Sequence, residues 1–228
     1  MIRILLAEIP STPPPPPQWQ TQLNQLPATH HPAILRFRRW QDRQATLLGR
    51  LLLRQALLEA EHEAHTLRDW RLGEHGKPRV AEDIFFNISH TEGLVVCAVS
   101  RLGEVGIDCE RIRPIALEDF QSLMDPATWQ SIHTAAHPEQ AFFDFWTARE
   151  SVVKGDGRGL SIPFSALEIQ DNRATIRPPH TPAPHGVQSW RIHPVTTRPG
   201  YCCHLATPVS TPPIAPILCF PAKSSSFL

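Results

Sequence analysis

Cysteine is scarce in this sequence, and the few cysteines follow no pattern. There are five in 228 residues, an odd number without regular spacing. A disulfide-stapled secreted scaffold carries an even, spaced set, so the count argues against that class of protein. The twelve histidines are scattered and no Cys-x-x-Cys pair accompanies them, which argues against a zinc site. The sequence therefore predicts buried free thiols in a reducing compartment.

Net charge, long apolar runs and nucleotide-binding signatures are absent as well. Lysine and arginine number 22, as do aspartate and glutamate, so no overall field attracts nucleic acid. The apolar stretch at residues 1–9 is too short for a signal peptide or a membrane span. Neither a Walker loop nor a kinase signature occurs, which disfavours the common nucleotide-dependent phosphotransferases. We expect a cytoplasmic protein that binds neither nucleic acid nor membrane.

The length and the hydrophobic content of 41% suit a globular chain of one large domain or two small lobes. Periodicity and turn residues predict helices over 33–60, 116–124, 126–136 and 138–154, and strands over 84–88, 94–99, 105–110, 165–170, 187–193 and 200–206. The five prolines at 13–17 predict a polyproline II loop, and the tail from about residue 208 should be irregular. The expected lobes are residues 1–104 and 105–228.

A strand-like run and a helical run carry the residues with the clearest chemistry. In the predicted strand 105–110 the side chains alternate, so Asp108 and Glu110 share one face. In the last predicted helix the period aligns Glu150 with Lys154. If strand and helix pack together, three carboxylates and a lysine converge, which suits a divalent cation held against a phosphate ester. Each run alone is also compatible with a solvated face or a surface ion pair.

Four segments together resemble the 4′-phosphopantetheinyl transferases, in the two-lobed surfactin-synthetase-activating form. They are Gly76-Lys77-Pro78, Phe86-Asn87-Ile88-Ser89-His90, Gly106-Ile107-Asp108-Cys109-Glu110, and Trp146 to Lys154 continuing into Gly159-Leu160-Ser161. The resemblance extends from about residue 36 to about residue 163. It implies an α+β fold of two pseudo-symmetric α/β lobes in one monomeric chain, with the active site in the cleft between them.

The resemblance implies an enzyme that transfers the 4′-phosphopantetheine arm of coenzyme A to a serine of an apo acyl- or peptidyl-carrier protein, releasing 3′,5′-ADP. Magnesium, or manganese in its place, would be held by Asp108, Glu110 and Glu150. Lys154, with Asp108, would contact coenzyme A and stabilise charge on its diphosphate. Two routes stay open for the serine proton, directly to Glu150 or through a water molecule. A non-catalytic coenzyme A-binding or carrier-docking module is the alternative, and the intact carboxylates argue against it.

The same resemblance assigns further contacts to coenzyme A. Gly76 allows close backbone approach, and Lys77 would lie near the nucleotide phosphate. Ser89 and His90 would hold phosphate oxygens, because a hydroxyl and an imidazole can both donate hydrogen bonds. Cys109, between the two strand carboxylates, should point away from the metal and is predicted to belong to the core.

This chain departs from the family pattern at two basic positions. The arginine that directly precedes the Thr-Leu-Leu-Gly run is replaced by Ala45, so we predict that Arg43, helped by Arg39, binds the 3′-phosphate of coenzyme A. At helical spacing, Arg36 would lie on the same stripe. The usual lysine before the helix glutamate is Arg149, which keeps the charge but changes its reach.

Overall fold

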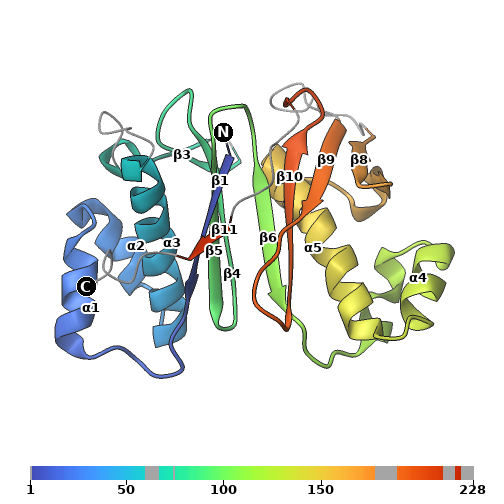
Figure 1. Cartoon of the computed structure of the whole chain (residues 1–228), viewed down its shortest axis with the longest axis horizontal. Coiled ribbons are helices and arrows are strands. Elements are labelled where there is room, and N and C mark those ends of the chain that lie inside the picture. Colours follow the sequence, from blue (N-terminus) through green and yellow to red (C-terminus); the bar gives the residue numbers. More distant parts are fainter. Residues whose placement is uncertain (1, 60–66, 74, 178–188, 213–218, 222–228) are drawn as a thin grey trace.

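A computed structural model describes residues 2–59, 67–73, 75–177, 189–212 and 219–221. Three strands of the N-terminal half and one from near the C-terminus form a four-stranded sheet (Figure 1). Its order is β11 (Cys219–Pro221), β1 (Ile2–Glu8), β5 (Leu94–Ser100) and β4 (Phe85–Thr91). β1 and β4 each pair antiparallel with β5, whereas β11 pairs parallel with β1. Every residue of β5 is buried, as expected for a central strand rich in β-branched residues.

The last strand corrects one expectation. The sequence predicts an irregular tail from about residue 208, whereas β11 returns to the N-terminal half and extends its sheet. The chain therefore crosses back over the predicted boundary near residue 104, and the lobe limits remain a prediction. The parts of the tail at 213–218 and 222–228 lie outside the described residues.

The second sheet has five strands that pair antiparallel throughout. Its order is β6 (Gly106–Arg111), β10 (Tyr201–Pro208), β9 (Ser189–Pro194), β8 (Arg173–Ile176) and β7 (Leu167–Gln170). A separate two-stranded ribbon joins β2 (Arg71–Leu72) to β3 (Pro78–Arg79). Periodicity missed β8, which follows a tight turn where Asp171 and Asn172 adopt φ of 49° and 59°.

The two sheets pack face to face in the middle of the molecule, with helices on their outer sides (Figure 1). Apolar side chains of β1 and β5, such as Ile4 and Val96, meet those of β6 and β10, such as Ile107 and Leu205, in one buried cluster. The expected α+β class is confirmed. Within the described residues, no helix is long and apolar enough to cross a membrane.

The N-terminal helices begin and end differently from the sequence prediction. The prolines at 16–17 do not extend a polyproline loop but form the first turn of α1 (Pro16–Asn24), where the missing amide proton costs nothing. The single helix predicted over 33–60 is two helices, α2 (His31–Leu35) and α3 (Trp40–Glu59), separated by an irregular segment at 36–39. The buried leucines of α3 cover the outer face of the first sheet.

In the C-terminal half, α4 (Pro126–His133) and α5 (Pro138–Asp156) start at the predicted prolines. The Asp125 carboxylate caps α4 by accepting hydrogen bonds from two backbone amides at 3.0 Å. Gly157 ends α5 with φ of 91°. Short 3₁₀ helices occur at Ala28–His30, Leu67–Asp69, Leu117–Leu123, Gly159–Ser161 and Phe164–Ala166.

A glycine contact sets how closely α5 lies against β6. A Cβ atom at Gly106 would lie 2.0 Å from the carbonyl oxygen of Ser151 and 2.2 Å from the amide nitrogen of Gly155. No residue larger than glycine fits at position 106, because the backbones of the helix and the strand are in direct contact there. The contact lies close to Asp108 on the strand and to Lys154 on the helix, and it brings the two predicted runs together.

Candidate active site

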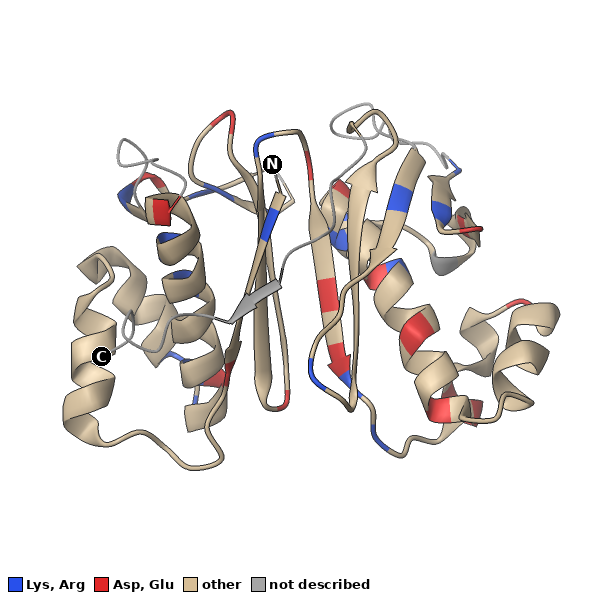
Figure 2. Cartoon of the chain, in the orientation of Figure 1, with Lys and Arg blue, Asp and Glu red and all other residues tan. Residues whose placement is uncertain are grey.

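Three predicted residues from three different elements meet where β4, β6 and α5 come together. The Lys154 ammonium donates to Asp108 Oδ1 at 2.5 Å and to Ser89 Oγ at 2.9 Å. The Ser89 hydroxyl lies 2.9 Å from the same Asp108 oxygen. Figure 2 shows acidic residues on both β6 and α5. The predicted convergence of strand carboxylate and helix lysine is therefore present.

The hydrogen bonds of Ser89 differ from the predicted role. The Lys154 ammonium and the backbone amide of Cys109, at 3.3 Å, can only donate, so both lone pairs of the Ser89 hydroxyl are occupied. Its single proton then goes to Asp108. In this arrangement Ser89 has no donor for a phosphate oxygen, and it organises the aspartate and the lysine instead.

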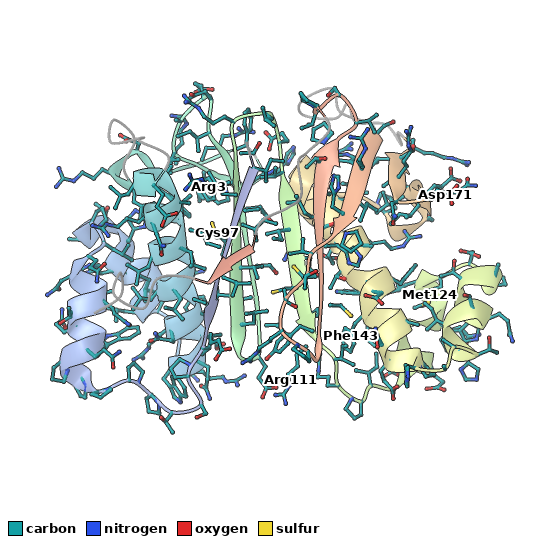
Figure 3. All side chains as sticks on the ribbon, in the orientation of Figure 1. Arg3, Cys97, Arg111, Met124, Phe143 and Asp171 are labelled. Carbon is teal, nitrogen blue, oxygen red and sulfur yellow. The ribbon has the colours of Figure 1, made fainter. Side chains whose placement is uncertain are left out.

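The second strand carboxylate, Glu110, is held in the same way by a residue that the sequence analysis did not single out. The hydroxyl of Thr91 lies 2.9 Å from Glu110 Oε2 and 3.2 Å from the backbone amide of Arg111. Arg111, labelled in Figure 3, marks this end of β6. The signal was available in the sequence, because polar side chains alternate along β4 at Asn87, Ser89 and Thr91.

The alternation on β4 joins the two halves of the molecule. Three side-chain oxygens of β4 accept hydrogen bonds from every second backbone amide of β6. The pairs are Asn87 with Ile107, Ser89 with Cys109, and Thr91 with Arg111. These side chains replace the backbone ladder that would otherwise pair neighbouring strands. The predicted interior position of Cys109 is confirmed, since its side chain is fully buried and burial raises the pKa of its thiol to about 12.

Burial raises the pKa of both Glu110 and Glu150, and repulsion from the buried Asp108 raises each of them further. Asp108 is only 3% exposed, and its Oδ2 is buried with no hydrogen-bond partner among the described residues. A bound cation stabilises the ionised form of buried, mutually repelling carboxylates, and carboxylate oxygens are ligands that magnesium prefers. The chemistry of these residues thus fits the predicted ion. Among the described residues, however, no three His, Cys, Asp or Glu side chains are grouped closely enough to hold a metal ion as they stand.

Lys77 has a structural role that the sequence did not reveal. Its ammonium donates to Glu104 Oε2 at 2.7 Å, to the carbonyl of Val105 at 3.1 Å and to the carbonyl of Gly155 at 2.6 Å. These bonds use all three of its protons, so this arrangement does not support the predicted phosphate contact. Burial lowers the pKa of Lys77, and Glu104 opposes that shift. Lys77 ties the β2–β3 ribbon to the start of β6 and the end of α5.

Two cavities adjoin the junction. The smaller, of about 290 Å³, is lined by Gly76, Lys77, Glu150 and Lys154 among others. The larger, of about 1130 Å³, lies at the opposite end of β4 and β6 and has walls from both halves of the molecule. His90 lines it; partial burial lowers the pKa of its imidazole, and the nearby Lys154 lowers it further.

Four arginines line the larger cavity: Arg39, Arg111, Arg113 and Arg198. Arg43 is not among its lining residues, and its Nε donates to the carbonyl oxygen of Phe37 at 2.7 Å. The predicted stripe of Arg36, Arg39 and Arg43 is wrong, because the first two precede the start of α3. Arg149 lines neither of these two cavities, and its Nη1 donates to the carbonyl oxygen of Leu167 at 2.7 Å.

These features define a class of protein: an α+β chain in which a buried aspartate, paired with a half-buried lysine, lies near an arginine-lined cavity, an arrangement that suits the binding of a phosphate ester. Residues 104–206 match the family described as "4'-phosphopantetheinyl transferase superfamily", and residues 12–102 match "4'-phosphopantetheinyl transferase, N-terminal". The chain belongs to the 4'-phosphopantetheinyl transferase superfamily, which confirms the recognition from its motifs.

Similarity to individual bacterial proteins supports the same family assignment. The chain is similar to 4'-phosphopantetheinyl transferase psf-1 of Bacillus pumilus, with 34% identity over 71% of this chain and 72% of the relative. It is 29% identical to 4'-phosphopantetheinyl transferase Sfp of Bacillus subtilis (strain 168), over 70% of this chain and 74% of the relative. With 4'-phosphopantetheinyl transferase gsp of Aneurinibacillus migulanus it shares 36% identity over 62% of this chain, and the alignment spans only 60% of that relative.

Proposed function

We propose that this chain transfers the 4′-phosphopantetheine arm of coenzyme A to a serine of an apo acyl- or peptidyl-carrier protein, releasing 3′,5′-ADP. The observation that supports this most strongly is the contact of Lys154 with Asp108 and Ser89, which joins segments from both family matches. The proposal includes two pseudo-symmetric lobes, residues 1–104 and 105–228, with the active site in the cleft between them. One monomeric chain would then supply both walls of the site.

In the proposed reaction the serine oxygen forms a bond to the phosphorus that bears the pantetheine arm. The bond from that phosphorus to the bridging oxygen breaks, and its electron pair leaves with 3′,5′-ADP. A magnesium or manganese ion held by Asp108, Glu110 and Glu150 would neutralise charge on the diphosphate. Lys154 has a third proton to donate to a phosphate oxygen, because Asp108 and Ser89 take two of its three and no other described residue accepts one.

Glu150 is the group we propose to receive the serine proton, directly or through one water molecule. Burial raises the pKa of its carboxyl, with repulsion from Asp108 as the next cause, and a carboxylate with a raised pKa is a stronger base. Glu150 is half-buried, and it lines the smaller cavity beside Lys154.

The reaction is tested by incubating the protein with coenzyme A, Mg²⁺ and a panel of apo carrier proteins, and measuring the intact mass of each carrier. We expect one or more carriers to gain the mass of the phosphopantetheine arm, to lose this gain with a chelator, and to regain it with excess Mg²⁺ or Mn²⁺. Full transfer in metal-free buffer would remove the metal from the proposal. Coenzyme A binding without transfer to any carrier would instead support a non-catalytic binding or docking module.

The cavity geometry favours Arg39 over Arg43 as the contact for the 3′-phosphate of coenzyme A. Arg39 is exposed and lines the larger cavity, near Ala45, where the family's arginine is missing. A phosphomonoester carries a charge of roughly −1.5 to −2 near neutral pH. Because the contact is solvent-screened, we expect about 1.4 kcal/mol, so Arg39→Ala should weaken coenzyme A binding about tenfold.

Calorimetric titrations with coenzyme A and dephospho-coenzyme A test this assignment. Arg39→Ala should barely change the affinity for dephospho-coenzyme A, which lacks the 3′-phosphate. Arg43→Ala is the matched control, since it removes an arginine that holds the carbonyl of Phe37. If Arg43→Ala alone discriminated between the two ligands, the original prediction from the sequence would be right and the assignment to Arg39 wrong.

A further inference from the structure

Two hydroxyl groups of β4 hold the two carboxylates of β6, and one of them, Thr91, has no role in the site as predicted from the family. Thr91 is half-buried, and its hydroxyl bridges Glu110 Oε2 at 2.9 Å and the Arg111 amide at 3.2 Å. The neighbouring hydroxyl of Ser89 bridges Asp108 and the Cys109 amide in the same manner. The repetition two residues along both strands shows that the Thr91 contact belongs to a regular arrangement.

The direction of each hydrogen bond at Thr91 is fixed by chemistry. The amide of Arg111 can only donate, so it occupies a lone pair of the Thr91 oxygen. The single hydroxyl proton of Thr91 is then left for the Glu110 carboxylate, which as an anion can only accept. The backbone of β6 thus orients the hydroxyl, and the hydroxyl in turn orients the carboxylate.

Among the described residues, the Glu110 carboxylate has one side-chain partner besides Thr91. Nη1 of Arg113 lies 3.8 Å from the same oxygen, Oε2, and the Arg113 side chain is half exposed. At 3.8 Å, and with the arginine half exposed, this ion pair is weak and does not fix the geometry of the carboxylate. The hydroxyl of Thr91 is closer and comes from a strand, so it determines the rotamer of Glu110. The other oxygen, Oε1, receives no hydrogen bond within the described part of the chain, which leaves it for a ligand.

We propose that Thr91 is a positioning residue, which fixes the Glu110 carboxylate in the orientation that binds the divalent cation. This rests on the proposed function, in which Glu110 is one of three carboxylate ligands. Groups that orient a metal ligand typically change metal affinity or activity by about 10–100-fold when removed. In this proposal Thr91 acts through Glu110, and both residues line the larger cavity.

The test is a Mn²⁺ titration of the protein with coenzyme A bound, followed by the electron paramagnetic resonance signal of free Mn²⁺. Thr91→Val keeps the shape and removes the hydroxyl, and should weaken Mn²⁺ binding about tenfold. Thr91→Ser keeps the hydroxyl and should retain the wild-type affinity. Ser100→Ala is a matched control. The Ser100 hydroxyl also accepts a hydrogen bond from a backbone amide, that of Leu102, but within the described residues it bonds to no carboxylate.

A double-mutant cycle with Glu110→Gln separates positioning from a purely structural role. If Thr91 acts through Glu110, Thr91→Val should have no further effect on Mn²⁺ affinity in the Glu110→Gln background. An equal effect in both backgrounds, or a loss in Thr91→Ser as large as in Thr91→Val, would overturn the proposal. Urea unfolding of each variant confirms that the folded state is being compared, and Thr91→Ala repeats the cycle should the valine variant fail to fold.

Failure of the inference and failure of the proposed function give different results. If the wild type binds Mn²⁺ and transfers the arm, and Thr91→Val does so equally well, only the positioning role is overturned. If the wild type neither binds Mn²⁺ nor modifies any carrier, the proposed function fails, and the role of Thr91 fails with it.

Discussion

Replacing Asp108 with asparagine is expected to lower kcat/KM for carrier modification by roughly 10²–10³-fold, about the loss in kcat that follows when one hydrogen-bond donor to a developing oxyanion is removed. The substitution is close to isosteric. Its amide oxygen can still accept hydrogen bonds from Ser89 and Lys154, so the junction of β4, β6 and α5 keeps its shape. What disappears is the negative charge and the buried Oδ2, which has no hydrogen-bond partner among the described residues and is left for a cation.

Steady-state kinetics with an apo carrier, together with urea unfolding, measure this effect. The free energy of unfolding should change much less than the activation free energy, because the lost group is a ligand and not part of the apolar core. Asp171→Asn is the control, since Asp171 lies in an exposed turn between β7 and β8, far from the junction (Figure 3). An Asp108→Asn variant with wild-type kcat/KM would exclude Asp108 from the reaction.

Gly106→Ala is expected to destabilise the protein by at least about 3 kcal/mol, the upper end of what overpacking usually costs. The new methyl group would lie 2.0 Å and 2.2 Å from backbone atoms of α5, at Ser151 and Gly155. Backbone atoms inside a helix cannot rotate away as a side chain can, so the whole helix must move. For a chain of this size the cost corresponds to a fall in Tm of roughly 6–12 °C.

The same displacement should remove most of the activity, because α5 carries Lys154 and Glu150 toward Asp108. Gly49→Ala is an informative control. Its methyl group would lie 2.8 Å from a methyl of Ile88, a side chain that can shift, and alanine is better than glycine in a helix by about 1 kcal/mol. A small net change is expected there. Thermal unfolding of the two variants decides the matter, and a Gly106→Ala protein within about 1 kcal/mol of wild type would show that α5 is not held by this contact.

Several elements could be predicted from local pattern alone. The alternation that places Asp108 and Glu110 on one face and Cys109 in the core holds because a strand has a strict two-residue repeat. The helices α4 and α5 start where Asp-Pro and His-Pro predict, since proline fixes the backbone of a first turn. In contrast, the break between α2 and α3 has no proline or glycine to mark it, and the arginine stripe built on an unbroken helix was wrong.

The sequence by itself determined the family and the set of acidic and basic residues at the junction, because these lie in short motifs whose spacing is fixed by strand and helix geometry. Only the tertiary structure decided what each residue touches. Lys77 donates to Gly155, 78 positions away, and β11 pairs with β1 at the opposite end of the chain. Ser89 likewise forms hydrogen bonds with Asp108 and Lys154, which are 19 and 65 positions away. A polar side chain binds whichever partner the fold brings within about 3 Å, and a local pattern contains no information about partners so distant in the sequence.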